Sequence, residues 1–191
     1  MPDSPVSDTE TLVTAEHLTE EDAARLREAQ LDQLLYLVDE IEALKVVIDL
    51  VPENLQTGRP LGKELSLREL YGTLADADLK LYEPLARAMA SNRHPKKDLP
   101  EDEELIAESG WNKKAMGAIL EEVQSARRSF TRVLERIPSQ EWFRTATIDD
   151  TVRDIHGLVH LVIQHDAELL RTAGHRLHES HLTDREEDLP K

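Results

Sequence analysis

The chain contains no cysteine among its 191 residues. This absence excludes disulfide bonds, a thiolate nucleophile and any zinc or iron–sulfur site with cysteine ligands. The sequence also lacks the run of about 18 apolar residues that a membrane-spanning helix requires. Its first residues are acidic and do not form the apolar stretch of a secretory signal peptide. We therefore expect a cytoplasmic protein that has no membrane partner.

Basic residues are scarce relative to acidic ones. The chain has 39 acidic and 23 basic residues, which gives a formal net charge of −16. A charge of this sign repels phosphate backbones, and no basic patch is visible, so we expect no nucleic-acid partner. Arginine is preferred over lysine, which is compatible with salt adaptation, although a solvated acidic surface is the simpler interpretation. Hydrophobic residues make up only 39% of the chain, which favours helices with wide polar faces.

The distribution of polar residues divides the chain into a single domain with two extensions. Residues 1–18 have no hydrophobic period and predict a disordered N-terminal arm. Residues 19–177 carry helical periodicity and predict a bundle of four helices. Residues 178–191 predict a polar C-terminal tail.

Capping signals and prolines place the first two helices. Thr19 begins a helix that runs to about residue 50. Ser66 and Glu69 have the spacing of a capping box, in which each side chain bonds to the backbone of the other residue. The helix that follows contains Pro84, which removes one backbone hydrogen bond and predicts a kink over residues 80–84.

The third and fourth helices follow a long connection over residues 91–110. The fourth is expected to begin near Thr151 and to end at Gly174. Because short links join antiparallel neighbours and a long link permits a parallel crossover, we predict an all-α, up-down-down-up four-helix bundle. The seam of the third helix steps alternately by three and four residues. Its members are Met116, Ile119, Val123, Ala126, Phe130, Val133 and Ile137.

A carboxylate lies on the apolar face predicted for the last helix. At 100° per residue, Asp166 falls about 20° from the centre of that face, and His165 falls at its border. A buried carboxylate costs several kcal/mol unless it is paired or hydrated. His165 and Asp166 are therefore candidate catalytic or ligand-binding residues in a polar pocket, unless the helix is rotated so that Asp166 lies at the rim.

Other chemical motifs are weak. His156 and His160 have the i, i+4 spacing of a metal-binding pair, but their angles place both imidazoles away from the core. The acidic run 101–104 is interpreted as a solvated segment, and the aromatic residues as core or bundle-end packing. The sequence contains no glycine-rich phosphate loop and no hydrolase or zincin motif.

Two stretches of the sequence resemble the DinB/YfiT-like superfamily of four-helix bundles. The first is SLRELYGTLADAD at positions 66–78. The second runs from TVRDI at positions 151–155 to HDAEL at positions 165–169. The resemblance covers about residues 28–175. It implies a bundle in which three histidines hold nickel or zinc. It also implies an activity like that of metal-dependent hydrolases or thiol S-transferases, and, because such bundles often dimerise, a homodimer.

The resemblance does not carry a complete metal site to this chain. Thr73 stands where the family has its first histidine, His165 matches the second, and Leu169 stands where the third would be. Asp78 and Asp166 are the carboxylates that could substitute for the missing ligands. We therefore expect no cofactor, and a zinc or nickel ion on a rearranged set of ligands is the alternative.

Three functional interpretations follow. The first is a divergent, metal-free bundle that binds a small molecule in a cavity near Thr73, Asp78, His165 and Asp166. The second is a metal- or thiol-dependent transferase or hydrolase, in which His165 acts as base or ligand and Asp166 orients it. The third is a stress-response interaction module without a pocket.

Overall fold

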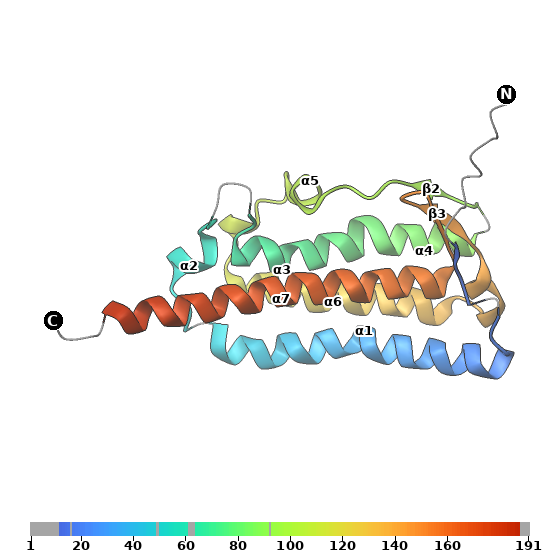
Figure 1. Cartoon of the computed structure of the whole chain (residues 1–191), viewed down its shortest axis with the longest axis horizontal. Helices are drawn as coiled ribbons and strands as arrows, with labels where there is room; N and C mark the ends of the chain where they lie inside the picture. The colour runs from blue at the N-terminus through green and yellow to red at the C-terminus, as the bar shows by residue number, and fades with distance from the viewer. Residues whose placement is uncertain (1–11, 16, 49, 61–63, 92, 188–191) are drawn as a thin grey trace, which may run out of the picture.

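The computed structural model describes residues 12–15, 17–48, 50–60, 64–91 and 93–187. Long helices lie side by side and form a four-helix bundle (Figure 1). They are α1 (Glu20–Ile48), α3 (Leu67–Asp76) continuing through a π-helical segment (Ala77–Tyr82) into α4 (Glu83–Ala90), α6 (Met116–Arg136) and α7 (Ile155–Glu187). Shorter elements are α2 (Glu53–Thr57), α5 (Asp102–Ile106) and 3₁₀ turns at Trp111–Lys113 and Ser139–Phe143. None of the described helices is long and apolar enough to cross a membrane.

Hydrogen bonds between helices fix their relative directions. Arg27, near the start of α1, donates to the Glu135 carbonyl at the end of α6 over 2.9 Å, so these helices are antiparallel. Gln30 of α1 bonds to His156 at the start of α7, so α1 and α7 begin at the same end of the bundle. In Figure 1, α3 and α6 both begin at the opposite end, and the long segment that carries α5 returns the chain between them.

A small β-sheet at one end of the bundle corrects the all-α prediction. The order is β1-β4-β3-β2, with β3 and β4 antiparallel and the outer pairs parallel. Asp149 and Asp150 form the β3–β4 turn with positive φ angles, which aspartate tolerates better than most residues. Strands this short do not show a two-residue period in the sequence. They are β1 (Leu12–Val13), β2 (Lys96–Lys97), β3 (Ala146–Ile148) and β4 (Thr151–Arg153).

The two ends of the domain also differ from the predictions. Part of the predicted disordered arm is ordered, since β1 pairs with β4 and the Ala15 N–H donates to Asp154 over 2.6 Å. The other carboxylate oxygen of Asp154 caps α7 by accepting from the Gly157 N–H, so the helix begins at Ile155 and not at Thr151. Helix α7 then continues through Gly174 to Glu187, into the predicted tail. Residues 1–11 and 188–191 lie outside the described residues.

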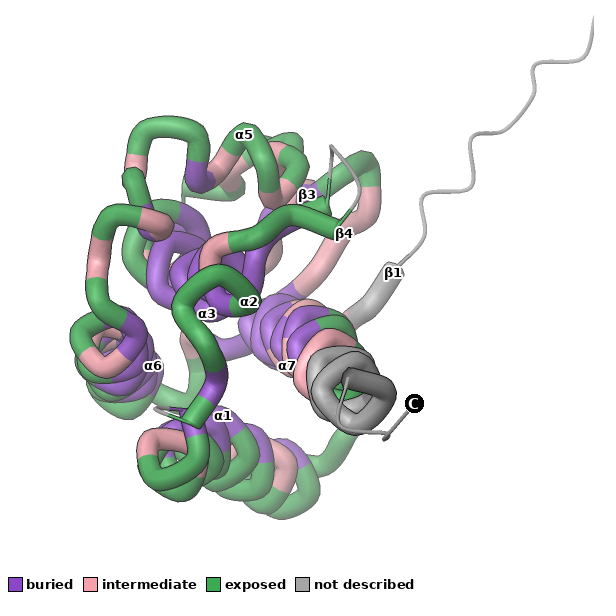
Figure 2. The backbone as a smooth tube through the Cα atoms, turned by 90° about the vertical axis from the view of Figure 1, so that its left-hand side faces the viewer, coloured by how far each residue is buried: buried purple, intermediate pink, exposed green. Residues whose placement is uncertain are grey.

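The core confirms the helical patterns of the sequence. Every residue of the α6 seam is buried, as Figure 2 shows for the inner sides of the helices in general. The capping box at Ser66 and Glu69 is present. Trp142, from the turn after α6, is fully buried at the end of the bundle. The predicted kink region overlaps the last residues of the π-helical segment, which ends two residues before Pro84.

Gly72 lets the ring of Trp111 pack directly on helix α3. A Cβ atom built at Gly72 would overlap the indole ring, and the ring is held in place because its Nε1–H donates to Asp76 over 2.9 Å. Gly174 differs, since no described atom lies within 4 Å of a Cβ built there. The two helical glycines therefore have opposite consequences for stability.

We predict that Gly72→Ala lowers the free energy of unfolding by about 1–3 kcal/mol, because the added methyl group overpacks the site against Trp111. Gly174→Ala, the matched control, should raise it by about 0.5–1 kcal/mol, because alanine restricts the unfolded chain and favours the helix. Urea denaturation of both variants checks this pair, and a Gly72→Ala variant as stable as wild type would contradict the close packing.

Candidate functional site

A fully buried arginine lies at the centre of the bundle. Arg127 of α6 has no exposed side-chain surface. Its Nη1 and Nη2 groups donate to the two carboxylate oxygens of Asp166 on α7, over 2.6 and 2.9 Å. Its Nε–H donates to Asp78 over 2.7 Å. Because an unpaired buried charge is strongly destabilising, these three side chains form one unit, which we call the Arg127 triad.

The π-helical segment places Asp78 toward Arg127. The Glu83 N–H donates to the Asp78 carbonyl, an i to i−5 bond that widens the helix over Ala77–Tyr82. Pro84 follows Glu83 and has no N–H to donate to the residue four positions earlier. Isolated π turns are frequent at functional sites because they re-aim side chains. Here the segment carries both Asp78 and Tyr82 to the inside of the bundle.

The triad carries two carboxylates for one guanidinium. Burial raises the pKa of Asp78 to about 6, although the charge of Arg127 acts in the opposite direction. One oxygen of Asp78, Oδ1, is buried without a hydrogen-bond partner among the described residues. Burial lowers the pKa of Arg127, but Asp78 and Asp166 outweigh it and hold this pKa above its ordinary value. The arginine therefore remains charged.

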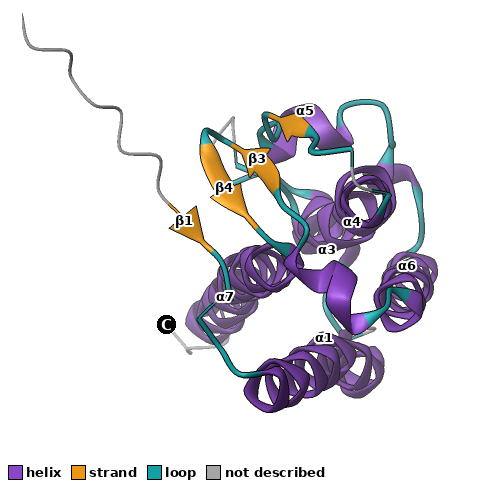
Figure 3. Ribbon diagram, turned by 90° about the vertical axis from the view of Figure 1, so that its right-hand side faces the viewer, coloured by secondary structure: helices purple, strands orange, loops and turns teal. Residues whose placement is uncertain are grey.

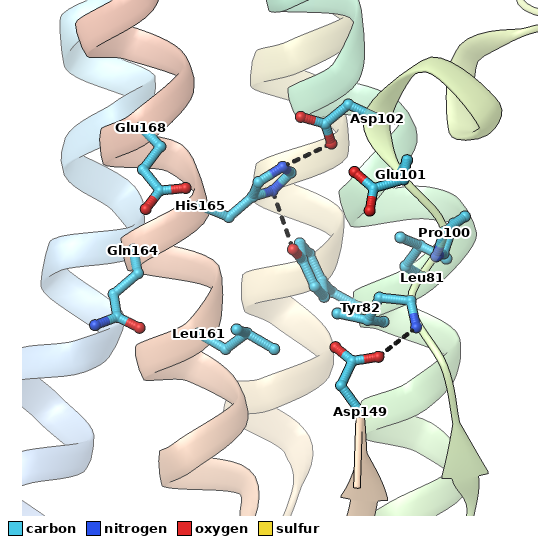
Figure 4. A pocket seen from close by; sticks show the side chains of 11 residues that line it. Leu81, Tyr82, Pro100, Glu101, Asp102, Asp149, Leu161, Gln164, His165 and Glu168 are labelled. Atoms are coloured by element: carbon cyan, nitrogen blue, oxygen red, sulfur yellow. Dashed lines mark hydrogen bonds and ion pairs between the residues drawn. The ribbon is translucent and has the colours of Figure 1, made fainter. Parts of the chain in front are cut away.

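His165 lies beside the triad and faces the surface. Its Nδ1 hydrogen bonds to the Tyr82 hydroxyl over 3.0 Å, and its Nε2 bonds to Asp102 over 2.9 Å (Figure 4). Burial lowers the pKa of His165, but the hydrogen bond and the charge of Asp102 outweigh it, so the net shift is upward. Burial is also the main cause of the raised pKa of Tyr82, which keeps its hydroxyl protonated.

A cavity of about 350 Å³ opens beside His165 and Tyr82. Its walls come from the π-helical segment, α7, the segment that leads into α5, and the β3–β4 turn (Figure 4). Asp149 helps to hold this last wall, because its carboxylate accepts from the Leu99 N–H over 2.8 Å. The lining contains the carboxylates of Glu101, Asp102, Asp149 and Glu168. The hydrophobic part of the lining consists of Leu81, Leu99, Pro100 and Leu161. We call this space the His165 cavity.

His156 differs from its predicted position. The sequence analysis placed it away from the core, but it is buried and its ring lies 4.8 Å from that of Trp142, centroid to centroid. Its Nδ1 bonds to Gln30 over 2.8 Å. His160 is exposed. The described residues contain no group of three or more histidine or acidic side chains placed to hold a metal ion.

Of the comparisons with known proteins, the comparison with solved structures found a similar fold. No protein-family model matches the chain, and no curated protein matches it. A solved structure, YfiT from Bacillus subtilis, matches with a TM-score of 0.56 and 14% sequence identity, over 83% of this chain and 91% of that one. That protein is described as a probable metal-dependent hydrolase with an unusual four-helix bundle topology. The chain has the DinB/YfiT-like fold.

The positions at which the resemblance predicted metal ligands do not present a set of free ligands in the described residues. Thr73 is buried and its hydroxyl donates to the Glu69 carbonyl over 2.8 Å. Leu169 packs in the hydrophobic core. Asp78 and Asp166, the substitutes considered from the sequence, are brought together but are paired with the guanidinium of Arg127. His165 is the remaining donor, and both its nitrogens are engaged, so the residues present do not form a three-ligand site.

Three residues of the candidate site, Arg127, Tyr82 and Asp102, were not identified from the sequence. Arg127 lies on a line one residue beside the predicted seam, and that whole line is buried: Leu120, Gln124, Arg127, Thr131 and Leu134. The three- and four-residue spacing of this second line was the signal that could have revealed it. Tyr82 was assigned to core packing. Asp102 was assigned to a solvated run, and no local pattern indicates that its side chain reaches His165 of α7.

We predict that Asp166→Leu lowers the free energy of unfolding by about 3–5 kcal/mol, because it leaves Arg127 buried with only one of its two partners. Replacing the whole triad, as Asp78→Leu, Arg127→Met and Asp166→Leu together, should restore most of this loss. Urea denaturation of both proteins at neutral pH measures the difference. If the single variant is as stable as wild type, the triad is not the interaction we describe.

We also predict that the Asp102–His165 pair stabilises the fold less as pH rises. The folded-state pKa of His165 is raised above its ordinary value of 6.5. The contribution of the pair is therefore fully present below that value and is lost as pH rises through the raised pKa. Asp102→Asn should reduce unfolding free energy more at about pH 6 than at about pH 9. Asp98→Asn, an exposed change in the same segment, should show no such trend.

Proposed function

We propose that this chain is an up-down-down-up bundle that binds a small organic cation in the His165 cavity and that it does so without a metal ion. The observation that carries the proposal is the composition of the cavity wall. Among the residues that the structure describes, four carboxylates line it and no lysine or arginine does. A protonated His165 contributes one positive charge, so the wall stays negative over the neutral pH range.

The remaining lining supports an organic cation over a bare inorganic ion. The Tyr82 ring and the side chains of Leu81 and Leu161 provide a hydrophobic surface beside the carboxylates. The volume of about 350 Å³ falls in the range of small-molecule sites. An ammonium group can make charge-assisted hydrogen bonds to Glu101 and Glu168, while its hydrocarbon part packs on the apolar wall.

The hydrogen bonds of His165 favour binding over catalysis. The structural neighbour is described as a probable metal-dependent hydrolase. A general base must present a free nitrogen to its substrate, but Nδ1 of His165 faces Tyr82 and Nε2 faces Asp102. The imidazole instead joins α7 to the start of α5, which forms one wall of the cavity. We therefore assign His165 a positioning role in the binding site.

We predict saturable binding of phenethylamine, measured by isothermal titration calorimetry in the presence of EDTA. Glu101→Gln and Glu168→Gln together should weaken this binding by about tenfold or more, because two charged acceptors become neutral. Glu121→Gln, an exposed change on α6, serves as the matched control and should leave the affinity unchanged.

The neutral analogue 2-phenylethanol has the same ring and chain length and tests whether the charge is recognised. It should bind at least about tenfold more weakly than the amine. Equal affinities for the two compounds, or no saturable heat with the amine, would overturn the assignment of a cation. Binding that appears only after zinc or nickel is added would favour the metal-dependent alternative.

A further inference from the structure

A second cavity, of about 300 Å³, lies at the end of the bundle where α1 and α7 begin. Figure 3 views the bundle from this end. The lining comes from the first turns of α1, the turn Ser139–Phe143 and the first residues of α7. It shares no residue with the lining of the His165 cavity. We call it the Arg27 cavity, after the basic residue in its wall.

Arg27 has a positive charge that no ion pair within the described part of the chain neutralises. Its Nη2 group donates to the backbone carbonyls of Glu135 and Ile137 at the end of α6, over 2.9 and 3.2 Å, and Nη1 donates to the Ser139 hydroxyl. These acceptors are all uncharged. Among the described residues, Arg27 forms no ion pair with a carboxylate, in contrast to Arg127. The guanidinium therefore brings a positive charge to the cavity that is not paired with a carboxylate in the described part of the chain.

Two residues that line the Arg27 cavity each have a buried N–H donor without a hydrogen-bond partner in the described part of the chain. The donors are Nε of Arg27 and Nε1 of Trp142. Trp142 is fully buried, and the Arg27 guanidinium lies 5.1 Å from the centre of its ring. Unsatisfied buried donors are rare in folded proteins and each calls for an acceptor. Both residues contribute to the lining of the same cavity.

From this arrangement we infer that the Arg27 cavity binds a small aromatic carboxylate. Its carboxylate oxygens would accept from Arg27 Nε–H and Trp142 Nε1–H, so both unpaired donors and the unneutralised charge would be satisfied by one group. The rings of Phe143 and His156 and the methyl group of Ala23 line the rest of the cavity and suit a planar, apolar body. Glu20 is exposed and is the acidic residue of the lining, so it weakens the attraction for an anion.

The test uses the full chain with benzoate and indole-3-acetate as probes in isothermal titration calorimetry, each paired with its neutral amide. The carboxylates should bind saturably, and the amides should bind at least about tenfold more weakly, because they carry no charge for Arg27. Absence of saturable binding by both carboxylates, or amides that bind equally well, would overturn the inference.

Variants locate the binding to this cavity. Arg27→Gln should weaken carboxylate binding by about tenfold or more, whereas Arg128→Gln, an exposed change of the same kind on α6, should not change it. Because Arg27 also binds the end of α6, Trp142→Phe provides a second test that keeps an aromatic ring and removes the Nε1–H together with the pyrrole part of the indole. It should weaken binding severalfold, and Glu20→Gln should strengthen it. Wild-type affinity in both Arg27→Gln and Trp142→Phe would overturn the inference.

Discussion

The burial of one guanidinium is the constraint on which the centre of this bundle depends. Arg127 is removed from water on α6, and the cost of that removal is compensated only if carboxylates reach it from neighbouring helices. Asp78 and Asp166 do so from opposite sides, so three helices must adopt one axial position relative to each other. Apolar packing alone tolerates small shifts of register, whereas charge-assisted hydrogen bonds of 2.6–2.9 Å do not.

The geometry of the surface site follows from that constraint. Successive residues of a helix are rotated by about 100°, so an inward Asp166 turns His165 toward the crossover segment. On the other side, Tyr82 follows Asp78 by four residues within the π-helical segment and meets the same imidazole. Asp102 then closes the arrangement from the start of α5. The His165 cavity is thus bounded by side chains whose directions are set by the buried ion pairs beneath them.

The sequence was informative for several patterns that are local, although the helical angle of His156 and the helix end at Gly174 were predicted wrongly. The α6 seam, the capping box at Ser66 and the burial of Asp166 depend on spacing along one helix, and the structure agrees with each of them. The partners of these residues were not predictable in the same way. Arg127 and Asp102 meet Asp166 and His165 across 39 and 63 residues of sequence. The strands are only two or three residues long. They form because the fold brings β1 beside β4, β4 beside β3 and β3 beside β2.

The two cavities show why net charge is a poor guide to the ligands of this protein. A chain with a formal charge of −16 would be expected to attract cations throughout. Yet the local charge depends on which ionic groups find partners inside the fold. Arg127 is matched by carboxylates, and among the described residues the lining of the His165 cavity has four carboxylates but no lysine or arginine, so it stays acidic. Arg27 is held by neutral carbonyls and keeps its charge at the other cavity. Because buried partners screen a charge far more effectively than distant surface carboxylates, opposite ligand preferences can exist in one acidic bundle.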